Sequence, residues 1–164
     1  MTADPPRSPG GTQDVANLGF VRPPFVYLAA ILVGVGLDLV RSLRWLPVGI
    51  GVWVGLPLVI SSLALFFAST RRFKTAGTPI PGNKPTTAIV QSGPYWFSRN
   101  PIYLAFSVLV LGIACWFNSL WLLGTLAVAV SLMSFVVIPR EEQYLERQFG
   151  AEYLEYKAKV RRWL

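Results

Sequence analysis

The residues best suited to chemistry in this sequence are an arginine and a pair of glutamates about forty positions apart. Arg99 comes directly before residues 100–139, which contain no Asp, Glu, Lys or Arg, and Glu141 and Glu142 come directly after them. A guanidinium binds a carboxylate and a carboxylate binds an ammonium, so the three side chains together would form a clamp for a zwitterion. Spacing alone also allows an interfacial salt bridge, which would contribute little stability if exposed.

The uncharged stretch is too long for a single membrane crossing. Forty helical residues would extend about 60 Å, twice the roughly 30 Å of a hydrocarbon core. The segment WFNSLW, residues 116–121, offers a polar turn between interfacial tryptophans. We therefore predict a helical hairpin over about 101–117 and 120–138. Its two ends return to one face of the membrane, which brings the arginine within reach of one of the glutamates.

Two further apolar runs, residues 23–40 and 45–70, predict two more membrane helices, with some irregularity early in the second run. The composition agrees, because 53% of the residues are hydrophobic and only 14% are charged, whereas soluble domains have about 25% charged residues. The predicted fold class is an all-α membrane protein of about four transmembrane helices, followed by amphipathic cytoplasmic helices at the C-terminus. Residues 1–19 are expected to form a disordered tail, and residues 20–164 a single transmembrane domain.

Basic residues predict the orientation in the membrane. They are concentrated in the connection 71–99 and in the tail 140–164, and the opposite face has only Arg41 and Arg44. The positive-inside rule then places both termini in the cytoplasm, in a bilayer that we expect to be an inner membrane of bacterial type. The net charge of +7 indicates contact with anionic membrane lipids rather than with nucleic acid.

Missing residue types narrow the chemistry. The chain has no histidine, which excludes histidine general bases and Ser-His-Asp arrangements, and no metal site is predicted. No GxGxxG or GxxxxGK[ST] motif is present, so a Rossmann or P-loop nucleotide site is not expected. Cys115 is interpreted as a small buried apolar residue. Asp38 is expected to form an ion pair or to face water near the outer end of its helix, although a carboxylate on an ion path is an alternative.

The order of the motifs resembles a known group of membrane enzymes. TTAIVQSGPYWFSRNPIYL contains G-x-Y and R-[HN]-P-x-Y, and it is followed by the hairpin, the paired glutamates and the tail FGAEYLEY. This arrangement, over residues 73–164, is similar to the isoprenylcysteine carboxyl methyltransferase and phospholipid methyltransferase family. The resemblance implies that S-adenosylmethionine binds at the cytoplasmic ends of the last membrane helices, beneath the C-terminal helices. A lipidic or small apolar acceptor would enter from the bilayer.

The resemblance also assigns roles to individual residues. The residues expected to bind the cofactor are Tyr95, Arg99, Asn100, Pro101, Tyr103, Glu141 and Glu142, and those expected to be catalytic are Arg99 and Glu142. In our hypothesis the arginine binds a carboxylate and one of the two glutamates binds the amino group of the cofactor. Aromatic faces attract a sulfonium, and those expected around the clamp are Tyr95, Trp96, Tyr103, Tyr144, Tyr153 and Tyr156.

Two departures from the family pattern bear on the acceptor. Asn100 replaces a histidine, and Ala105 stands where the family often has glycine. The leading prediction is a carboxyl O-methyltransferase of isoprenylcysteine type. A phospholipid N-methyltransferase, or a methyltransferase of another small apolar nucleophile, is the enzymatic alternative. A non-catalytic four-helix transporter or scaffold is an alternative of another class, and in that case Asp38 would matter and Glu141 would not.

Overall fold

The structure is a computed structural model that describes residues 22–80 and 86–164. Every regular element in these two ranges is helical, as the sequence predicts, and the predicted tail 1–19 lies outside them. The elements are α1 (Pro23–Val40), α2 (Ile50–Thr75), the 3-10 helix η1 (Gly93–Trp96), α3 (Pro101–Trp116), α4 (Leu120–Leu132), the π-helix η2 (Met133–Val137), α5 (Ile138–Phe149) and α6 (Ala151–Lys159).

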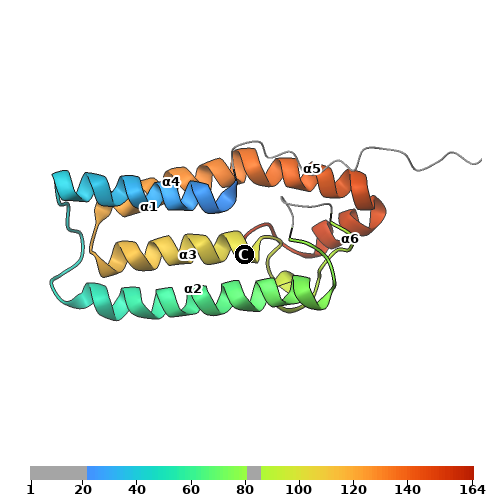
Figure 1. Cartoon of the computed structure of the whole chain (residues 1–164), viewed down its shortest axis with the longest axis horizontal. Helices are drawn as coiled ribbons and strands as arrows, with labels where there is room; N and C mark the ends of the chain where they lie inside the picture. Colours follow the sequence, from blue (N-terminus) through green and yellow to red (C-terminus); the bar gives the residue numbers. More distant parts are fainter. Residues whose placement is uncertain (1–21, 81–85) are drawn as a thin grey trace, which may run out of the picture.

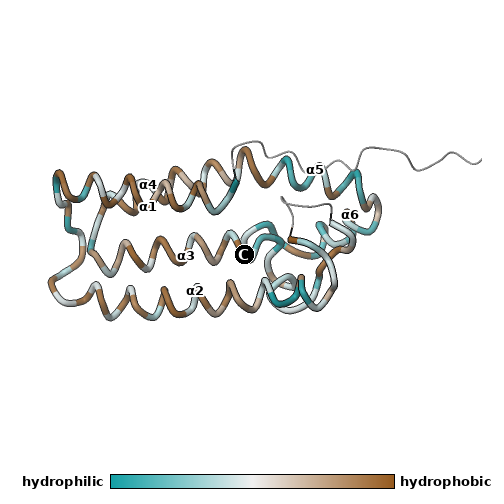
Figure 2. The backbone as a smooth tube through the Cα atoms, viewed as in Figure 1, coloured by the Kyte–Doolittle hydropathy of each residue, from teal (hydrophilic) through white to brown (hydrophobic). Residues whose placement is uncertain are grey.

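The four long helical segments, α1, α2, α3 and the continuous α4–η2–α5, run alternately up and down and form an elongated bundle (Figure 1). Helix α1 packs on α4, and α2 packs along α3. Three helical stretches, α1, α2 and the continuous Leu120–Phe149, are long and apolar enough to cross a membrane, and α3 is a shorter apolar helix between them. Apolar residues cover the bundle, whereas hydrophilic residues gather at the end that carries α5 and α6 (Figure 2).

The predicted hairpin turn is confirmed, with Asn118 at its centre. This residue has a positive φ of 52°, a conformation that asparagine tolerates better than most residues. Its Oδ1 accepts hydrogen bonds from the backbone N–H groups of Trp45 and Leu46, and its Nδ2 donates to the Leu46 carbonyl. The turn thus fastens the connection between α1 and α2, which is irregular as expected.

Asp38 forms the predicted ion pair at this same end of the bundle. Its Oδ2 lies 3.2 Å from Nη1 of Arg44. The Arg44 guanidinium also donates to the carbonyl of Phe117 at 2.6 Å, so it ties the end of α1 to the hairpin. The acid therefore has a structural partner.

Close contact between α2 and α3 depends on glycine. A Cβ added to Gly55 would lie 2.6 Å from the carbonyl oxygen of Gly112, and one added to Gly51 would lie 2.5 Å from that of Cys115. Both distances are too short for a real side chain, so the helices approach each other through their backbones. Cys115 is buried, as expected.

The last long helix carries a π-helical turn, η2, between α4 and α5. A π-turn holds one residue more than an α-turn and leaves part of the backbone ladder free for other partners. The stretch from α4 to α5 contains 30 residues, about 45 Å of helix, which exceeds a hydrocarbon core of about 30 Å. Its apolar part ends at Pro139, so α5 extends beyond the membrane-spanning segment.

Candidate functional site

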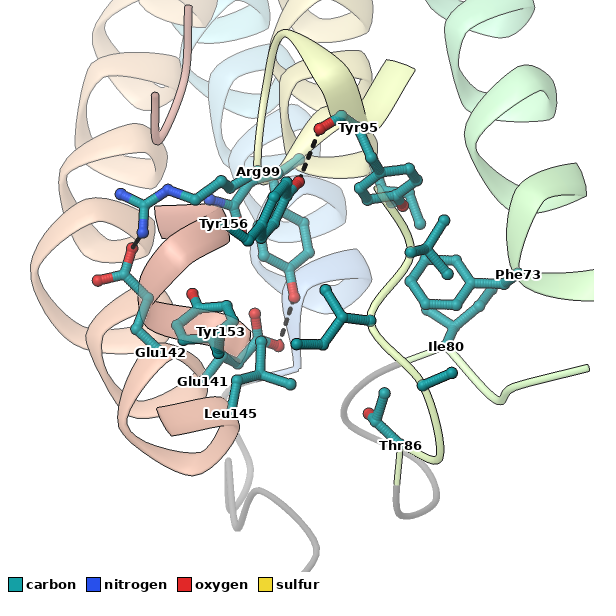
Figure 3. Close-up of a pocket in the computed structure, with 16 residues that line it drawn as sticks. Phe73, Ile80, Thr86, Tyr95, Arg99, Glu141, Glu142, Leu145, Tyr153 and Tyr156 are labelled. Atoms are coloured by element: carbon teal, nitrogen blue, oxygen red, sulfur yellow. Dashed lines mark hydrogen bonds and ion pairs between the residues drawn. The ribbon is translucent and has the colours of Figure 1, made fainter. Parts of the chain in front are cut away.

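A pocket lies at the hydrophilic end of the bundle, where α3 begins and α5 leaves the apolar layer. It encloses about 670 Å³ of space between atoms, part of which is open solvent. Its walls come from the end of α2, the segment after residue 85, η1, the start of α3, and α5 and α6 (Figure 3). Six of the seven predicted cofactor-binding residues line it, namely Tyr95, Arg99, Asn100, Tyr103, Glu141 and Glu142.

Pro101 is the seventh, and it does not line the pocket. It is buried at the first position of α3, where its missing N–H leaves no hydrogen bond unmade. Its role in this structure is to begin the helix directly after Arg99 and Asn100. The prediction that Pro101 contacts the cofactor therefore has no support in the geometry.

The loop before α3 is held by the C-terminal tail. The backbone N–H of Arg99 donates to the carbonyl of Arg161 at 2.9 Å, and the Asn100 Nδ2 donates to the carbonyl of Arg162 at 3.0 Å. The amide that replaces the family's histidine thus binds the protein's own tail. These bonds fix the position from which the Arg99 side chain enters the pocket.

Arg99 and Glu142 form a buried ion pair, so the predicted fold-back is confirmed and the salt bridge that the spacing also allowed is present. Nη1 of Arg99 lies 3.1 Å from Oε1 of Glu142, and the two side chains are only 10% and 8% exposed. Glu142 has further basic neighbours. Arg162 donates from Nε to Oε1 at 3.0 Å and from Nη2 to Oε2 at 2.7 Å, and Lys157 lies 3.8 Å away. The charge of Glu142 is therefore fully compensated within the protein.

Glu141 has a different environment, although it is the adjacent residue. Its carboxylate accepts a hydrogen bond from the Tyr103 hydroxyl at 2.5 Å, and the residue is 6% exposed. Among residues 22–80 and 86–164, no basic side chain forms an ion pair with it. Burial raises the pKa of Glu141 to about 7, an effect that the Tyr103 hydrogen bond opposes and the nearby Glu142 charge reinforces. A cationic ligand would stabilise its ionised form.

Four buried polar side-chain atoms have no hydrogen-bond partner in the described part of the chain. The buried side-chain atoms in this condition are Asp38 Oδ1, Thr86 Oγ1, Arg99 Nε and Arg99 Nη1, and all but the first belong to residues that line the pocket. Buried donors without partners are rare and unfavourable in proteins. The Arg99 donors therefore suit an anionic ligand group, and the Thr86 hydroxyl suits a further polar group.

Aromatic side chains cover the rest of the pocket. The Tyr156 hydroxyl donates to the carbonyl of Tyr95 at 2.7 Å, and Phe73 packs edge-on against Tyr95 with 5.3 Å between ring centroids. Burial raises the pKa of Tyr153 to about 12, so its ring carries an uncharged phenol at neutral pH. Neutral aromatic rings are favourable neighbours for a cation.

Two of the aromatic residues expected around the clamp do not line the pocket. Trp96 is 71% exposed, and that expectation was wrong because η1 turns its side chain outward. Tyr144 is buried, but its hydroxyl accepts a hydrogen bond from the backbone N–H of Thr86 at 3.2 Å. It supports the wall of the pocket from behind.

Sequence reasoning missed much of the apolar wall and one polar partner. Phe73, Val90, Ile102 and Leu145 line the pocket, but in the sequence they look like ordinary membrane or amphipathic-helix residues. Arg162 was assigned only to the basic tail. The pairing of a tail arginine with a buried glutamate 20 positions earlier has no local sequence signal, because it depends on how α6 folds back.

The arrangement of charges fits a zwitterionic ligand with an apolar portion. Arg99 can bind a carboxylate and Glu141 an ammonium, and both residues line a pocket with aromatic walls. The Arg99 guanidinium is directed towards Glu142 (Figure 3). The methionine part of S-adenosylmethionine has these two groups and a sulfonium. The residues present therefore fit this cofactor. In the described ranges, no group of three or more His, Cys, Asp or Glu could hold a metal ion.

Comparison with known proteins links the site to an enzyme family. The profile of the family described as phospholipid methyltransferase matches residues 50–152, more than half of the chain, and includes Arg99 and both glutamates.

Individual relatives cover parts of the same region. A stretch of 64 residues is 45% identical to an uncharacterized protein of Haemophilus influenzae and covers 38% of this chain and all of that protein. The cobalt-zinc-cadmium resistance protein CzcN of Cupriavidus metallidurans is 36% identical over 65% of this chain and 48% of its own. The nickel-cobalt-cadmium resistance protein NccN of Alcaligenes xylosoxydans xylosoxydans is 33% identical over 59% and 45%. The match thus spans about half the length of these two proteins.

Proposed function

This chain belongs to the phospholipid methyltransferase family, and from that premise we propose that it transfers a methyl group from S-adenosylmethionine to a lipophilic acceptor. The family establishes a membrane methyltransferase of the type that the sequence resembles. The observation that supports this cofactor is the pair of opposite charges that line one pocket, where Nε and Nη1 of Arg99 make no hydrogen bond and Glu141 has no cationic partner among the described residues.

We assign the two ends of the zwitterion as follows. Arg99 binds the carboxylate of the methionine part, because its buried Nε and Nη1 make no hydrogen bond among the described residues and charge-assisted hydrogen bonds are strong. Glu141 binds the ammonium, because Glu142 is already occupied by Arg162 and by Arg99. Glu142 acts by orienting Arg99, so its predicted catalytic role is indirect in this proposal.

The protein contributes alignment and a dry environment to the reaction. S-adenosylmethionine supplies, when bound, a methyl group already activated by the sulfonium, so the acceptor atom needs only to be placed in line behind it. Tyr95, Tyr153 and Tyr156 line the pocket and are themselves buried, so a cation bound between them would be shielded from water, which favours attack by the acceptor. An ionised carboxylate or thiolate acceptor requires no general base, and the absence of histidine is therefore no obstacle.

The acceptor is proposed to be lipophilic because its side of the pocket is apolar. Phe73, Ile102 and Leu145 belong to the apolar lining of the pocket, and Ile102, at the start of α3, packs against the buried cluster that contains Phe73. A carboxylate of isoprenylcysteine type is the leading acceptor class, and a phospholipid amine is the alternative. The clustering of basic residues at this end supports a cytoplasmic location for the pocket and for both termini, in an inner membrane.

Binding and methyl transfer by the purified protein test this proposal. Calorimetry in detergent should show binding of S-adenosylmethionine to wild type, and Glu141→Gln should weaken it at least tenfold because the ammonium loses a charged partner. Glu155→Gln is the matched control, since Glu155 is an exposed acid of α6 that pairs with Lys159. Transfer of labelled methyl from the cofactor into lipid extracts, followed by mass spectrometry, distinguishes carboxyl from amine acceptors.

Two results would contradict the proposal. Absence of S-adenosylmethionine binding by folded wild type would overturn the function, and equal binding by wild type and Glu141→Gln would overturn the site assignment. Asp38→Asn tests the transporter alternative. The proposal expects cofactor binding to be unaffected by this change, since Asp38 lies at the other end of the bundle, where it pairs with Arg44.

A further inference from the structure

The C-terminal tail after α6 contacts two elements next to the site. The carbonyl of Arg162 accepts from Nδ2 of Asn100, and its Nη1 donates to the carbonyl of Ser134 in the π-helical turn at 3.3 Å. The next residue, Trp163, donates from Nε1 to Oγ of Ser134 at 3.1 Å. The tail thus lies between the loop before α3 and the last membrane helix, with Arg162 in the middle.

The Arg162 side chain determines which hydrogen bonds Glu142 makes. Its Nε and Nη2 donate to the two carboxylate oxygens of Glu142 in a parallel fork, the geometry in which guanidinium and carboxylate bind most strongly. Nη1 of Arg99 lies within ion-pair distance of the same carboxylate but makes no aligned hydrogen bond to it. Glu142 therefore attracts and orients Arg99 while its oxygens are satisfied from another direction.

We propose that Arg162 is a positioning residue that keeps the Arg99 donors available for the carboxylate of the methyl donor. This inference rests on the proposed function. Arg162 and Arg99 compete for the buried carboxylate of Glu142, and it is Arg162 that forms the two aligned hydrogen bonds with it. The Arg99 charge is held in place by Glu142, while its buried Nε and Nη1 make no hydrogen bond among the described residues and can donate to a ligand carboxylate that reaches them.

Removal of the Arg162 side chain should reverse this arrangement. Glu142 is 8% exposed, and a buried carboxylate that loses its main partner recruits the nearest donor. That donor is Arg99, 3.1 Å away. Arg99 would then form its own aligned hydrogen bonds with Glu142, and a ligand carboxylate would have to compete for them.

A pair of ligands that differ only in the carboxylate separates this role from general support of the fold. The protein would be titrated by calorimetry in detergent with S-adenosylmethionine and with decarboxylated S-adenosylmethionine. Arg162→Ala should reduce the affinity for S-adenosylmethionine about tenfold or more, and the affinity for the decarboxylated ligand less than about threefold. The backbone carbonyl that binds Asn100 is retained in this variant. Arg161→Ala is the matched control, because Arg161 joins the network through its backbone carbonyl.

A second substitution provides a rescue. In Arg162→Ala/Glu142→Gln the competing charge is gone, so S-adenosylmethionine affinity should return to within about threefold of that of Glu142→Gln alone. If Arg162→Ala is not recovered in folded form, Arg162→Lys decides the same point. A lysine keeps the charge but cannot form the fork, and a selective loss of the carboxylate-bearing ligand is again expected.

The outcomes distinguish this inference from the function on which it rests. Equal losses for both ligands, or equal binding of S-adenosylmethionine by Arg162→Ala and Arg161→Ala, would overturn the positioning role and leave the proposed function intact. Failure of folded wild type to bind either ligand would overturn the proposed function itself. If Arg162→Ala selectively loses affinity for S-adenosylmethionine and the double variant regains it, the positioning role and the proposed function would both be supported.

Discussion

The two ends of the bundle use similar polar residues in opposite ways. At the end with the hairpin turn, both polar side-chain atoms of Asn118 form hydrogen bonds with the backbone of Trp45 and Leu46. At the same end, Arg44 pairs with Asp38 and donates to the Phe117 carbonyl. At the other end, Arg99 is more deeply buried, yet two of its nitrogen atoms make no hydrogen bond in the described part of the chain.

The difference indicates at which end the polar groups are satisfied without a ligand. An arginine that binds backbone carbonyls stabilises the fold, and its removal should reduce stability. An arginine with buried, unsatisfied donors lowers stability until a ligand binds. The comparison therefore predicts that substitutions at the hairpin end change unfolding, whereas those at the pocket end change ligand affinity.

Arg99→Ala should have the largest effect on binding. It removes the carboxylate partner, and loss of two charge-assisted hydrogen bonds should reduce S-adenosylmethionine affinity on the order of 100-fold. Arg44→Ala is the control at the opposite end, and its affinity should stay within about twofold of wild type. Calorimetry of both variants measures the difference in S-adenosylmethionine affinity. A similar loss of affinity in each would contradict the assignment of different roles to the two ends.

Asn118→Ala should have the largest effect on stability. Three hydrogen bonds to the α1–α2 connection are lost at about 1 kcal/mol each, and alanine is strained at a positive φ. The free energy of unfolding should fall by about 3–4 kcal/mol, with cofactor affinity unchanged in the folded protein. Denaturant unfolding in detergent is the measurement. A loss of affinity without a loss of stability would assign this turn to the ligand site.

The pH dependence of binding should report on Glu141. Its pKa is raised to about 7 by burial, and an ammonium binds the ionised form. Affinity should therefore rise up to about tenfold per pH unit as the pH increases towards 7, and level off above it. The raised pKa has the reverse effect on unliganded stability, which decreases as the pH rises from about 4.5 to 7, because the folded state then binds more protons.

The matched variant for this profile is Glu141→Gln. Calorimetry between pH 5 and 9 should give a flat profile with Glu141→Gln and a sloping one with wild type. A slope of equal size in both proteins would mean that another group titrates.

Tyr103→Phe should have a moderate effect. The Tyr103 hydroxyl donates to Glu141 and opposes the rise in its pKa, so its removal should shift the midpoint of the binding profile to higher pH. At pH 6 the affinity should fall severalfold, and at pH 9 the two proteins should differ little. A loss of the same size at every pH would indicate that the hydroxyl contacts the ligand directly.

Asp38→Asn should have the smallest effect. The pair with Arg44 is partly exposed, so the free energy of unfolding should change by less than about 1 kcal/mol. Cofactor affinity should be unchanged. Thermal unfolding and calorimetry on the same sample measure both, and a large loss of affinity would contradict the division between the two ends.

Much of the fold could be predicted from the sequence because membrane insertion imposes strong constraints. The length of the uncharged stretch 100–139 requires two crossings, and Asn118 marks the turn between them. The π-helical turn at Met133–Val137 could not be predicted, because its residues are as apolar as those of the α-helix on either side. The same holds for the close approach at Gly55, since glycines are common in membrane helices.

The site could be predicted in part. The return of both hairpin ends to one face brings Arg99 and Glu142 together, and this follows from helix length alone. The different roles of two adjacent glutamates could not be predicted, because they depend on whether a side chain faces Tyr103 or Arg162. Such partners are set by the folded tail, for which a single sequence offers no local pattern.

The π-helical turn also determines which side of α5 faces the pocket. One additional residue in the turn rotates everything after it by about 100° relative to an uninterrupted α-helix. Without that residue, Glu141 and Glu142 would still follow the same apolar segment, but their side chains would face different neighbours. The two acidic side chains thus belong to α5, but the direction in which they point is determined one turn earlier, within the apolar layer.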